Sequence, residues 1–211
     1  MNRLFLFLLS SCFFFSCKQS EEKTTNANKT NEVQTGNIQL VPIETPIGKF
    51  KVWTKRVGDN PTMKVLLLHG GPACTHEYFE CFENFFPQEN IEFYYYDQLG
   101  AYYSDQPTDT TLWQLDRFVE EVEQLRKALH LDKDNFYLLG HSWGGILAMQ
   151  YALKYQQNLK GLIISDMMSS APDYGKYAED VLSKQMDKNV LDTIRNIEAK
   201  KDFSNPTYMR L

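Results

Sequence analysis

The chain has 211 residues, of which 43% are hydrophobic and 23% charged, and its formal net charge is -5. This length and apolar content are sufficient for one good-sized hydrophobic core, and the composition is ordinary for a globular domain. Proteins that bind nucleic acid usually carry a basic face, so the acidic balance argues against nucleic acid as a partner.

The first residues have the pattern of a secretory signal. Arg3 precedes an apolar run over residues 4–9, which resumes over residues 12–15 and stops at Ser16 and Cys17. One positive residue, a short apolar region and a small residue at its end are typical of an export signal. The run is too short and interrupted for a transmembrane helix of ~20 apolar residues. We therefore expect residues 1–17 to be a signal peptide.

Cys17 resembles the processing site of bacterial lipoproteins, in which the cysteine sulfur takes the lipid and becomes the new N-terminus. Cys12 matches the same consensus, but processing there would leave only residues 4–9 as the apolar region and would expose residues 13–15. We favour Cys17, and a cleaved signal without lipid is the alternative. A lipid would anchor the exported protein to a membrane surface, facing the periplasm or the outside. Residues 18–36 are polar and predict a flexible linker.

The segments that follow alternate between strand and helix patterns. Residues 38–43 and 48–53 predict a hairpin, and the apolar run at 64–68 predicts a strand covered on both faces. A helix is expected over 76–86 and a strand over 91–96. Cys74 and Cys81 would lie too far apart on such a helix for a disulfide, so we expect small buried or half-buried thiols.

The next segments continue this alternation. Apolar residues spaced three and four apart predict an amphipathic helix from Thr111 to His130, with Thr110 or Thr111 as its N-cap. Strands are expected over 135–139 and 159–164, with a helix over 143–155 between them. This order predicts an α/β fold with a mostly parallel sheet flanked by helices and entered by an antiparallel hairpin.

The central motif is GHSWGG at residues 140–145, which follows a buried strand and precedes a helix. In Gly-x-Ser-x-Gly the serine occupies a strained strand-to-helix turn, and side chains two residues on either side would collide unless they are glycine. The N-terminus of the following helix favours developing negative charge. Ser142 is therefore the candidate nucleophile.

A second motif, HGGP at residues 69–72, ends an earlier buried strand. An acyl-transfer enzyme needs two N–H donors aimed at the oxyanion, and a loop in this position commonly supplies one of them. The N–H of Trp143, directly after the nucleophile, would supply the other. No metal or cofactor is implied, because no cluster of histidine, cysteine and aspartate has the spacing of metal ligands.

Three motifs in order resemble the proline iminopeptidases: LHGGP at 68–72, YDQLG at 96–100 and GHSWGG at 140–145. The family's motif Asp-Gln-Arg-Gly-x-Gly-x-Ser is present as DQLGAYYS at 97–104, with Leu99 and Tyr102 in place of the arginine and the second glycine. Asp97 and Gln98 are interpreted as residues that fix this loop.

The resemblance implies an α/β-hydrolase fold with an inserted helical cap, and carries over Ser142 as nucleophile and Gly71 and Trp143 as oxyanion donors. The core would span residues 37–168. Residues 169–211, which are polar and helix-prone without a strand signal, would form the start of the cap laid over the sheet.

The triad histidine is missing from the expected place. In this fold the order is Ser, acid, His, yet His69, His76, His130 and His141 all precede Ser142. We therefore expect a sequence that stops early, with the acid and the histidine beyond Leu211, and a chain that is inactive by itself. Asp166, after the strand at 159–164, is an alternative triad acid.

Taken together, the patterns predict a serine hydrolase that acts through an acyl-enzyme on Ser142. The resemblance implies that it releases N-terminal residues, preferably proline, from short peptides. Two alternatives stay open: an esterase or amide hydrolase on the same scaffold, and a surface lipoprotein that binds a ligand without catalysis.

Overall fold

The computed structural model describes residues 37–211. The predicted signal peptide, the linker and the two candidate lipidation sites at Cys12 and Cys17 lie outside the described residues.

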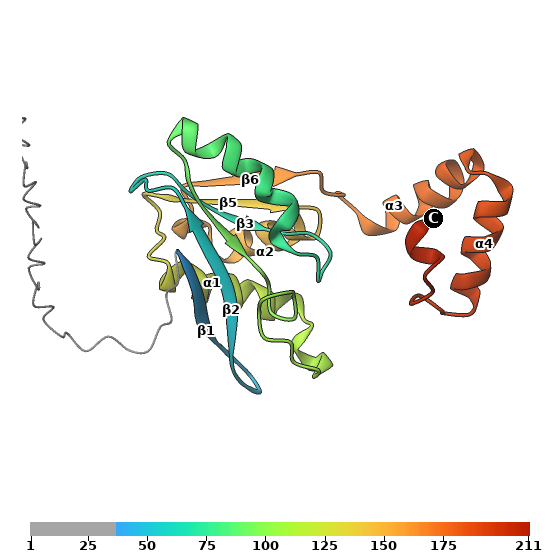
Figure 1. Ribbon diagram of the computed structural model, residues 1–211, viewed down its shortest axis with the longest axis horizontal. Coiled ribbons are helices and arrows are strands. Elements are labelled where there is room, and N and C mark those ends of the chain that lie inside the picture. The colour runs from blue at the N-terminus through green and yellow to red at the C-terminus, as the bar shows by residue number, and fades with distance from the viewer. Residues whose placement is uncertain (1–36) are drawn as a thin grey trace, which may run out of the picture. The chain divides into compact units, whose positions relative to one another are not determined.

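A six-stranded sheet forms the centre of the fold (Figure 1). Its order is β1-β2-β4-β3-β5-β6. Strands β4, β3, β5 and β6 run parallel to one another, β1 and β2 form an antiparallel hairpin, and β2 pairs antiparallel with β4. The strands are β1 (Ile38–Thr45), β2 (Gly48–Val57), β3 (Lys64–Leu68), β4 (Glu92–Tyr96), β5 (Phe136–His141) and β6 (Gly161–Ser165). The predicted parallel sheet with an antiparallel entry is confirmed.

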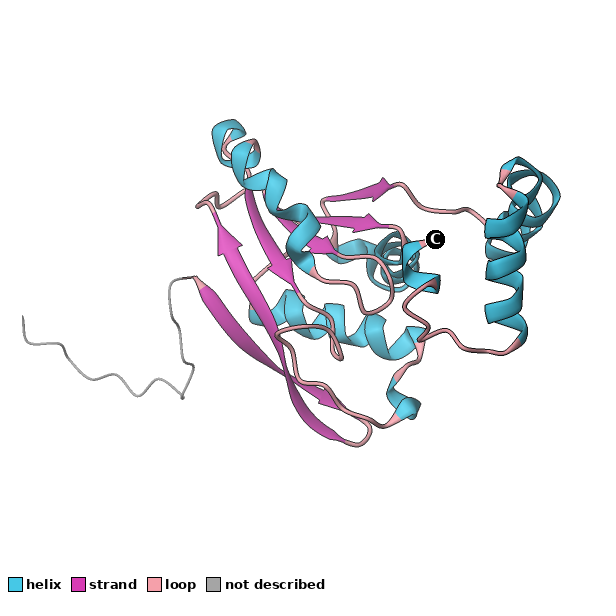
Figure 2. Cartoon of the chain, turned by 45° about the vertical axis from the view of Figure 1, so that its right-hand side comes forward, coloured by secondary structure: helices cyan, strands magenta, loops and turns pink. Residues whose placement is uncertain are grey.

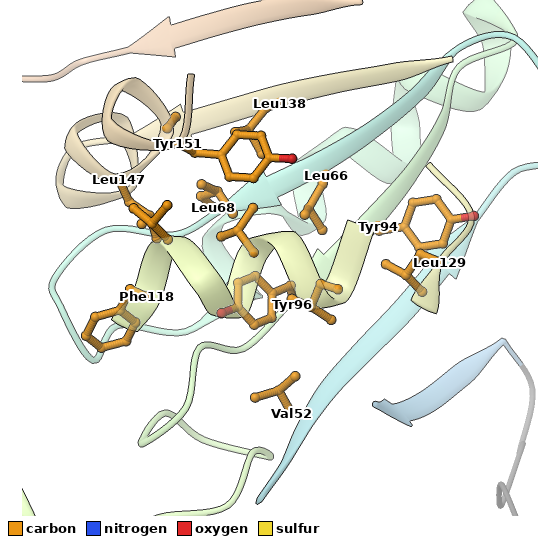
Figure 3. Close-up of a cluster of buried hydrophobic side chains, with 14 of the residues drawn as sticks. Val52, Leu66, Leu68, Tyr94, Tyr96, Phe118, Leu129, Leu138, Leu147 and Tyr151 are labelled. Carbon is orange, nitrogen blue, oxygen red and sulfur yellow. The ribbon is translucent and has the colours of Figure 1, made fainter. Parts of the chain in front are cut away.

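Strand β3 is buried on both faces, as its unbroken apolar run predicts. Successive side chains of a strand point to opposite faces, so β3 contributes to two hydrophobic clusters. Leu66 and Leu68 belong to the larger cluster, which contains helix residues such as Phe118 and Tyr151 (Figure 3). Val65 and Leu67 belong to the cluster on the other face.

Helices cover both faces of the sheet (Figure 2). Helices α1 (Leu115–Ala128) and α2 (Trp143–Tyr155) bury their apolar sides in the larger cluster. The opposite face is covered by two short 3-10 helices, His76–Asn84 and Phe86–Glu89. The element expected over 76–86 is thus helical but wound more tightly than an α-helix.

Helix α1 begins later than its pattern predicted. A 3-10 turn over Thr110–Leu112 comes first, and its N-cap is Asp109, whose side chain accepts the Thr111 N–H at 2.9 Å. The prediction of Thr110 or Thr111 as the cap is wrong, because the aspartate one residue earlier satisfies the free N–H. A 3-10 helix over Gln156–Asn158 follows α2.

Cys74 and Cys81 are both exposed free thiols, so the expectation of buried or half-buried cysteines is wrong. The 3-10 helix that carries Cys81 buries its face through residues such as Phe79, which leaves the cysteine on the outer side.

Strand β6 is different from β3. It is the last strand of the sheet in the described part of the chain, and Leu162, Ile163 and Ile164 are each about 40% exposed. The sheet is therefore apolar but uncovered along β6.

Residues 171–211 contain helices and, in the part of the chain that the structure describes, no strand. These are α3 (Ala171–Tyr177), a π-helical turn (Ala178–Leu182), 3-10 helices at Ser183–Gln185 and Tyr208–Arg210, and α4 (Lys188–Ala199). An ion pair between Arg195 and Glu179, 2.5 Å apart, joins α4 to the π-helical turn. Within residues 37–211, no helix has the length and apolar character needed to span a bilayer.

Candidate active site

Ser142 lies at the turn between strand β5 and helix α2 with φ 54° and ψ -121°. A positive φ is unfavourable for a residue with a side chain, so the surrounding structure must hold this conformation. It is held on both sides: the Ser142 N–H donates to the Ser165 carbonyl at 3.1 Å, and its own carbonyl accepts the Gly145 N–H at 2.9 Å. The serine side chain is half-buried. The turn thus presents a partly accessible hydroxyl on a strained backbone.

The glycines of the motif are required by close backbone contacts. A Cβ on Gly140 would overlap the carbonyl of Gly144, and a Cβ on Gly144 would overlap the carbonyl of Leu68 at the end of β3. The steric reason given for Gly-x-Ser-x-Gly from the sequence therefore applies in this chain. Helix α2 and strand β3 are in direct backbone contact beside the serine.

The loop after β3 lies against the nucleophile. A Cβ on Gly70 would be 3.1 Å from Ser142 Cβ and 3.5 Å from its Oγ, so the backbone of this loop packs closely against the serine side chain. The Gly70 N–H donates to the Tyr78 hydroxyl at 2.6 Å and is therefore already engaged. Gly71 has φ +112°, and a Cβ would lie 2.7 Å from the Cys74 nitrogen, so glycine is required there as well.

The two predicted oxyanion donors flank the serine. Trp143 is the first residue of α2, and Gly71 follows the glycine that touches Ser142. Within residues 37–211 neither the Gly71 N–H nor the Trp143 N–H donates to a protein acceptor. Both are therefore available to bind a developing negative charge, as an oxyanion hole requires.

Gln98 and His69 connect this loop to the next one. The Gln98 N–H donates to His69 Nε2 at 3.0 Å, and the side-chain Nε2 of Gln98 donates to the His69 carbonyl at 2.9 Å. Burial lowers the pKa of His69, so its imidazole stays neutral at pH 7. Asp97 accepts hydrogen bonds from the His76 backbone N–H at 3.0 Å and from its Nδ1 at 2.8 Å. These are the contacts of residues that fix loops.

Tyr78 and His141 pack beside the serine. Burial raises the pKa of Tyr78 to about 12, so its hydroxyl keeps its proton at neutral pH. The His141 ring lies 5.1 Å from the Tyr78 ring, and its Nε2 is 3.7 Å from the carboxylate of Asp166. In the described residues, no hydrogen bond joins Ser142 Oγ to a histidine.

An apolar cavity of about 360 Å³ is bordered by the loop after β3 and the loop after β4. Its walls are Pro72, Ala73, Leu99, Gly100, Trp113, Phe118 and Trp143. Trp143 follows the nucleophile directly, and Pro72 follows Gly71. The cavity is therefore lined by the sequence neighbours of Ser142 and Gly71.

Several of these residues were not predicted from the motifs. Tyr78, Trp113 and Phe118 carry no motif, and the sequence offers only apolar spacing for Phe118. Glu121 does leave a signal, because it interrupts the apolar stripe of α1 between Phe118 and Leu125. In the structure its buried carboxylate accepts the Leu99 N–H at 2.9 Å.

Comparison with known proteins agrees with this geometry. Residues 64–197 match the family described as alpha/beta hydrolase fold. The crystal structure of VinJ superposes on this chain with a TM-score of 0.71 at 26% sequence identity, covering 80% of this chain and 57% of VinJ. The chain belongs to the α/β-hydrolase fold family.

The relationship can be stated more closely. The chain is 70% identical over 172 residues to the proline iminopeptidase of Flavobacterium johnsoniae and 72% identical over 172 residues to that of Elizabethkingia meningoseptica, in each case over 82% of this chain. It spans 58% and 57% of the length of these curated relatives. Within the α/β hydrolases the chain is a member of the proline iminopeptidase family, and the resemblance inferred from the three motifs is confirmed.

The backbone contact between α2 and β3 can be tested by its effect on the stability of the fold. Gly144→Ala should destabilise the fold by about 3 kcal/mol or more, because the added methyl group overlaps a backbone carbonyl that cannot rotate away. Urea unfolding followed by circular dichroism measures the change.

The matched control is Gly175→Ala in α3, where a Cβ meets no atom within 4 Å. This substitution should leave stability unchanged or raise it slightly, since alanine favours helix. Equal midpoints for the two variants would contradict the proposed backbone contact.

Proposed function

We propose that this chain carries the nucleophile and the oxyanion hole of a serine peptidase that releases N-terminal residues, preferably proline, from short peptides. The observation that carries the proposal is Ser142 at a strained turn, with Gly70 against its hydroxyl and unpaired N–H groups at Gly71 and Trp143. The names of its relatives, proline iminopeptidases at 70% and 72% identity, support the substrate class.

The reaction follows from this arrangement. Ser142 Oγ attacks the carbonyl carbon of the first residue, and its proton passes to a base. The negative charge that develops on the carbonyl oxygen is held by the N–H groups of Gly71 and Trp143. The bond between carbon and nitrogen breaks, the departing amine takes the proton, and the first residue remains as an ester on Ser142. Water then hydrolyses the ester and restores the hydroxyl.

The apolar cavity supports a small, non-polar first residue. Its walls carry the indoles of Trp113 and Trp143 and the ring of Phe118, and its volume of about 360 Å³ exceeds that of a pyrrolidine ring. Burying a proline side chain against these rings would remove apolar surface from water, which would favour binding by about 25 cal/mol per Å² of buried surface.

The base is the part of the mechanism that the described residues do not supply. In this fold the histidine follows the nucleophile along the chain, and all four histidines of this sequence precede Ser142. His69 is engaged through both ring nitrogens, since Nε2 accepts the Gln98 N–H and Nδ1 bonds the Gly70 carbonyl. We therefore propose that the base and its acid come from sequence beyond this chain, and activity is to be assayed on the product of the complete gene.

The first prediction concerns the nucleophile. Ser142→Ala in the complete gene product should lower the turnover of proline-naphthylamide at least about 10³-fold, because no oxygen remains to form the ester. A fluorophosphonate probe should label the unmodified protein at this residue and leave the variant unlabelled.

The outcomes separate the proposal from its alternatives. Labelling at Ser142 with turnover of a short acyl ester but none of the naphthylamide would assign an esterase. Absence of labelling in a folded protein would overturn the enzyme and favour a ligand-binding lipoprotein.

We also propose that Cys17 takes a lipid that anchors the exported protein to a membrane surface. The basis is the sequence alone: a short apolar region ends at Ser16 and Cys17 and is followed by a polar segment. The anchor would leave the peptidase domain free in the aqueous phase.

Cys17→Ser should abolish incorporation of an alkyne-tagged palmitate in a bacterial host and release the protein from the membrane fraction. Cys12→Ser is the matched control and should leave incorporation unchanged. The reverse result would move the lipid to Cys12, and no incorporation in any form would mean a cleaved signal without an anchor.

A further inference from the structure

The side-chain amide of Gln98 lies between the two residues that would supply the oxyanion donors. Its Nε2 donates to the His69 carbonyl at 2.9 Å, at the start of the loop that carries Gly71. Its Oε1 accepts the indole N–H of Trp143 at 3.0 Å. One amide therefore joins the loop after β3 to the first residue of α2.

The orientation of this amide is fixed. Rotating it by half a turn would place its oxygen against the His69 carbonyl and its NH₂ group against the indole N–H, so both hydrogen bonds would be lost. The backbone N–H of the same residue donates to His69 Nε2 at 3.0 Å, which leaves the ring proton on Nδ1. Because burial keeps His69 neutral, this tautomer is stable at working pH.

Water has little access to the bonds between Gln98 and His69. Gln98 is 1% exposed and His69 is fully buried. A buried polar group that loses its partner costs about 1–3 kcal/mol, so the two loops would move to recover partners if the amide were removed.

The residues on either side of Gln98 are held as firmly. Asp97 is bonded to His76, and the Leu99 N–H donates to Glu121 at 2.9 Å. Glu121 is buried and in turn binds the guanidinium of Arg117 and the hydroxyl of Tyr96. Paired in this way, a buried carboxylate is a rigid anchor, and the position of Gln98 does not depend on solvent.

We infer that Gln98 is a positioning residue that sets the spacing of the two oxyanion donors, Gly71 and Trp143. This inference rests on the proposed function. It acts through the His69 carbonyl and the Trp143 indole and touches no substrate atom. A displacement of about 1 Å at a reacting centre can cost 10²-fold in rate, so loss of this bridge affects the chemical step rather than substrate binding.

The test uses the product of the complete gene and Gln98→Leu, which removes both side-chain hydrogen bonds and leaves an apolar side chain that is one atom shorter. The rate constant for phosphonylation of Ser142 by a fluorophosphonate should fall about 10- to 100-fold, because that step also places a negative oxygen in the oxyanion hole. In turnover, kcat should fall by a similar factor while KM stays within about two-fold. Gln106→Leu is the matched control, since that exposed glutamine bonds only the Tyr102 carbonyl in the same loop.

A second variant separates positioning from simple destabilisation. Gln98→Glu keeps an acceptor for the indole but, when ionised, faces the His69 carbonyl without a proton to donate. When protonated it can donate as the amide does. The ratio of its phosphonylation rate to that of the unmodified protein should therefore rise as the pH falls, measured over the pH range in which circular dichroism shows both proteins to be fully folded.

The results distinguish this inference from the proposed function. If the unmodified protein is not labelled, the proposed function fails. If it is labelled and folded Gln98→Leu is labelled at the same rate, the positioning role is wrong. Should Gln98→Leu not fold, Gln98→Glu decides alone: a pH-independent ratio to the unmodified protein would overturn the inference.

Discussion

The site depends on the backbone contact between helix α2 and strand β3. Gly144 lies so close to the Leu68 carbonyl that no side chain fits between them, and this contact fixes where α2 begins relative to the end of β3. Ser142 is the N-cap of that helix and the HGGP loop continues from that strand. The backbone contact between α2 and β3 therefore fixes the position of Ser142 relative to the candidate oxyanion loop. Close packing, and not a flexible loop, holds the two in place.

Around this junction lies a shell of buried polar groups whose hydrogen bonds are made within the fold. Asp97 and Gln98 bond the loop after β3, and Glu121 bonds the Leu99 backbone from helix α1. Such groups are costly to bury without partners, so their satisfaction keeps the loops in one arrangement. An arrangement of this kind suits catalysis, because donors that are already in place need not reorganise when charge develops.

The sequence was sufficient for the parallel sheet, the hairpin and the strained turn at Ser142, because each depends on local periodicity or on a short glycine-containing motif. The sequence was not sufficient where a contact joins residues far apart in the chain, or where several adjacent residues could each serve as a helix cap. The cap at Asp109 was missed because two threonines beside it have similar propensity. Cys74 and Cys81 were misjudged because Cys74 precedes the 3-10 helix and Cys81 lies on the outer side of that helix. The bridge from Gln98 to the Trp143 indole joins residues 45 positions apart, and no local pattern records it.

The residues that line the apolar cavity belong to different parts of the fold. Trp143 and Leu99 belong to the fixed junction, whereas Trp113 lies between a 3-10 turn and the start of α1 and is 39% exposed. The Trp113 ring lies over Gly100, so changes at Trp113 are expected to reshape this side of the cavity. Substitutions at this position would therefore alter which groups fit the cavity, whereas the α2–β3 junction would be retained.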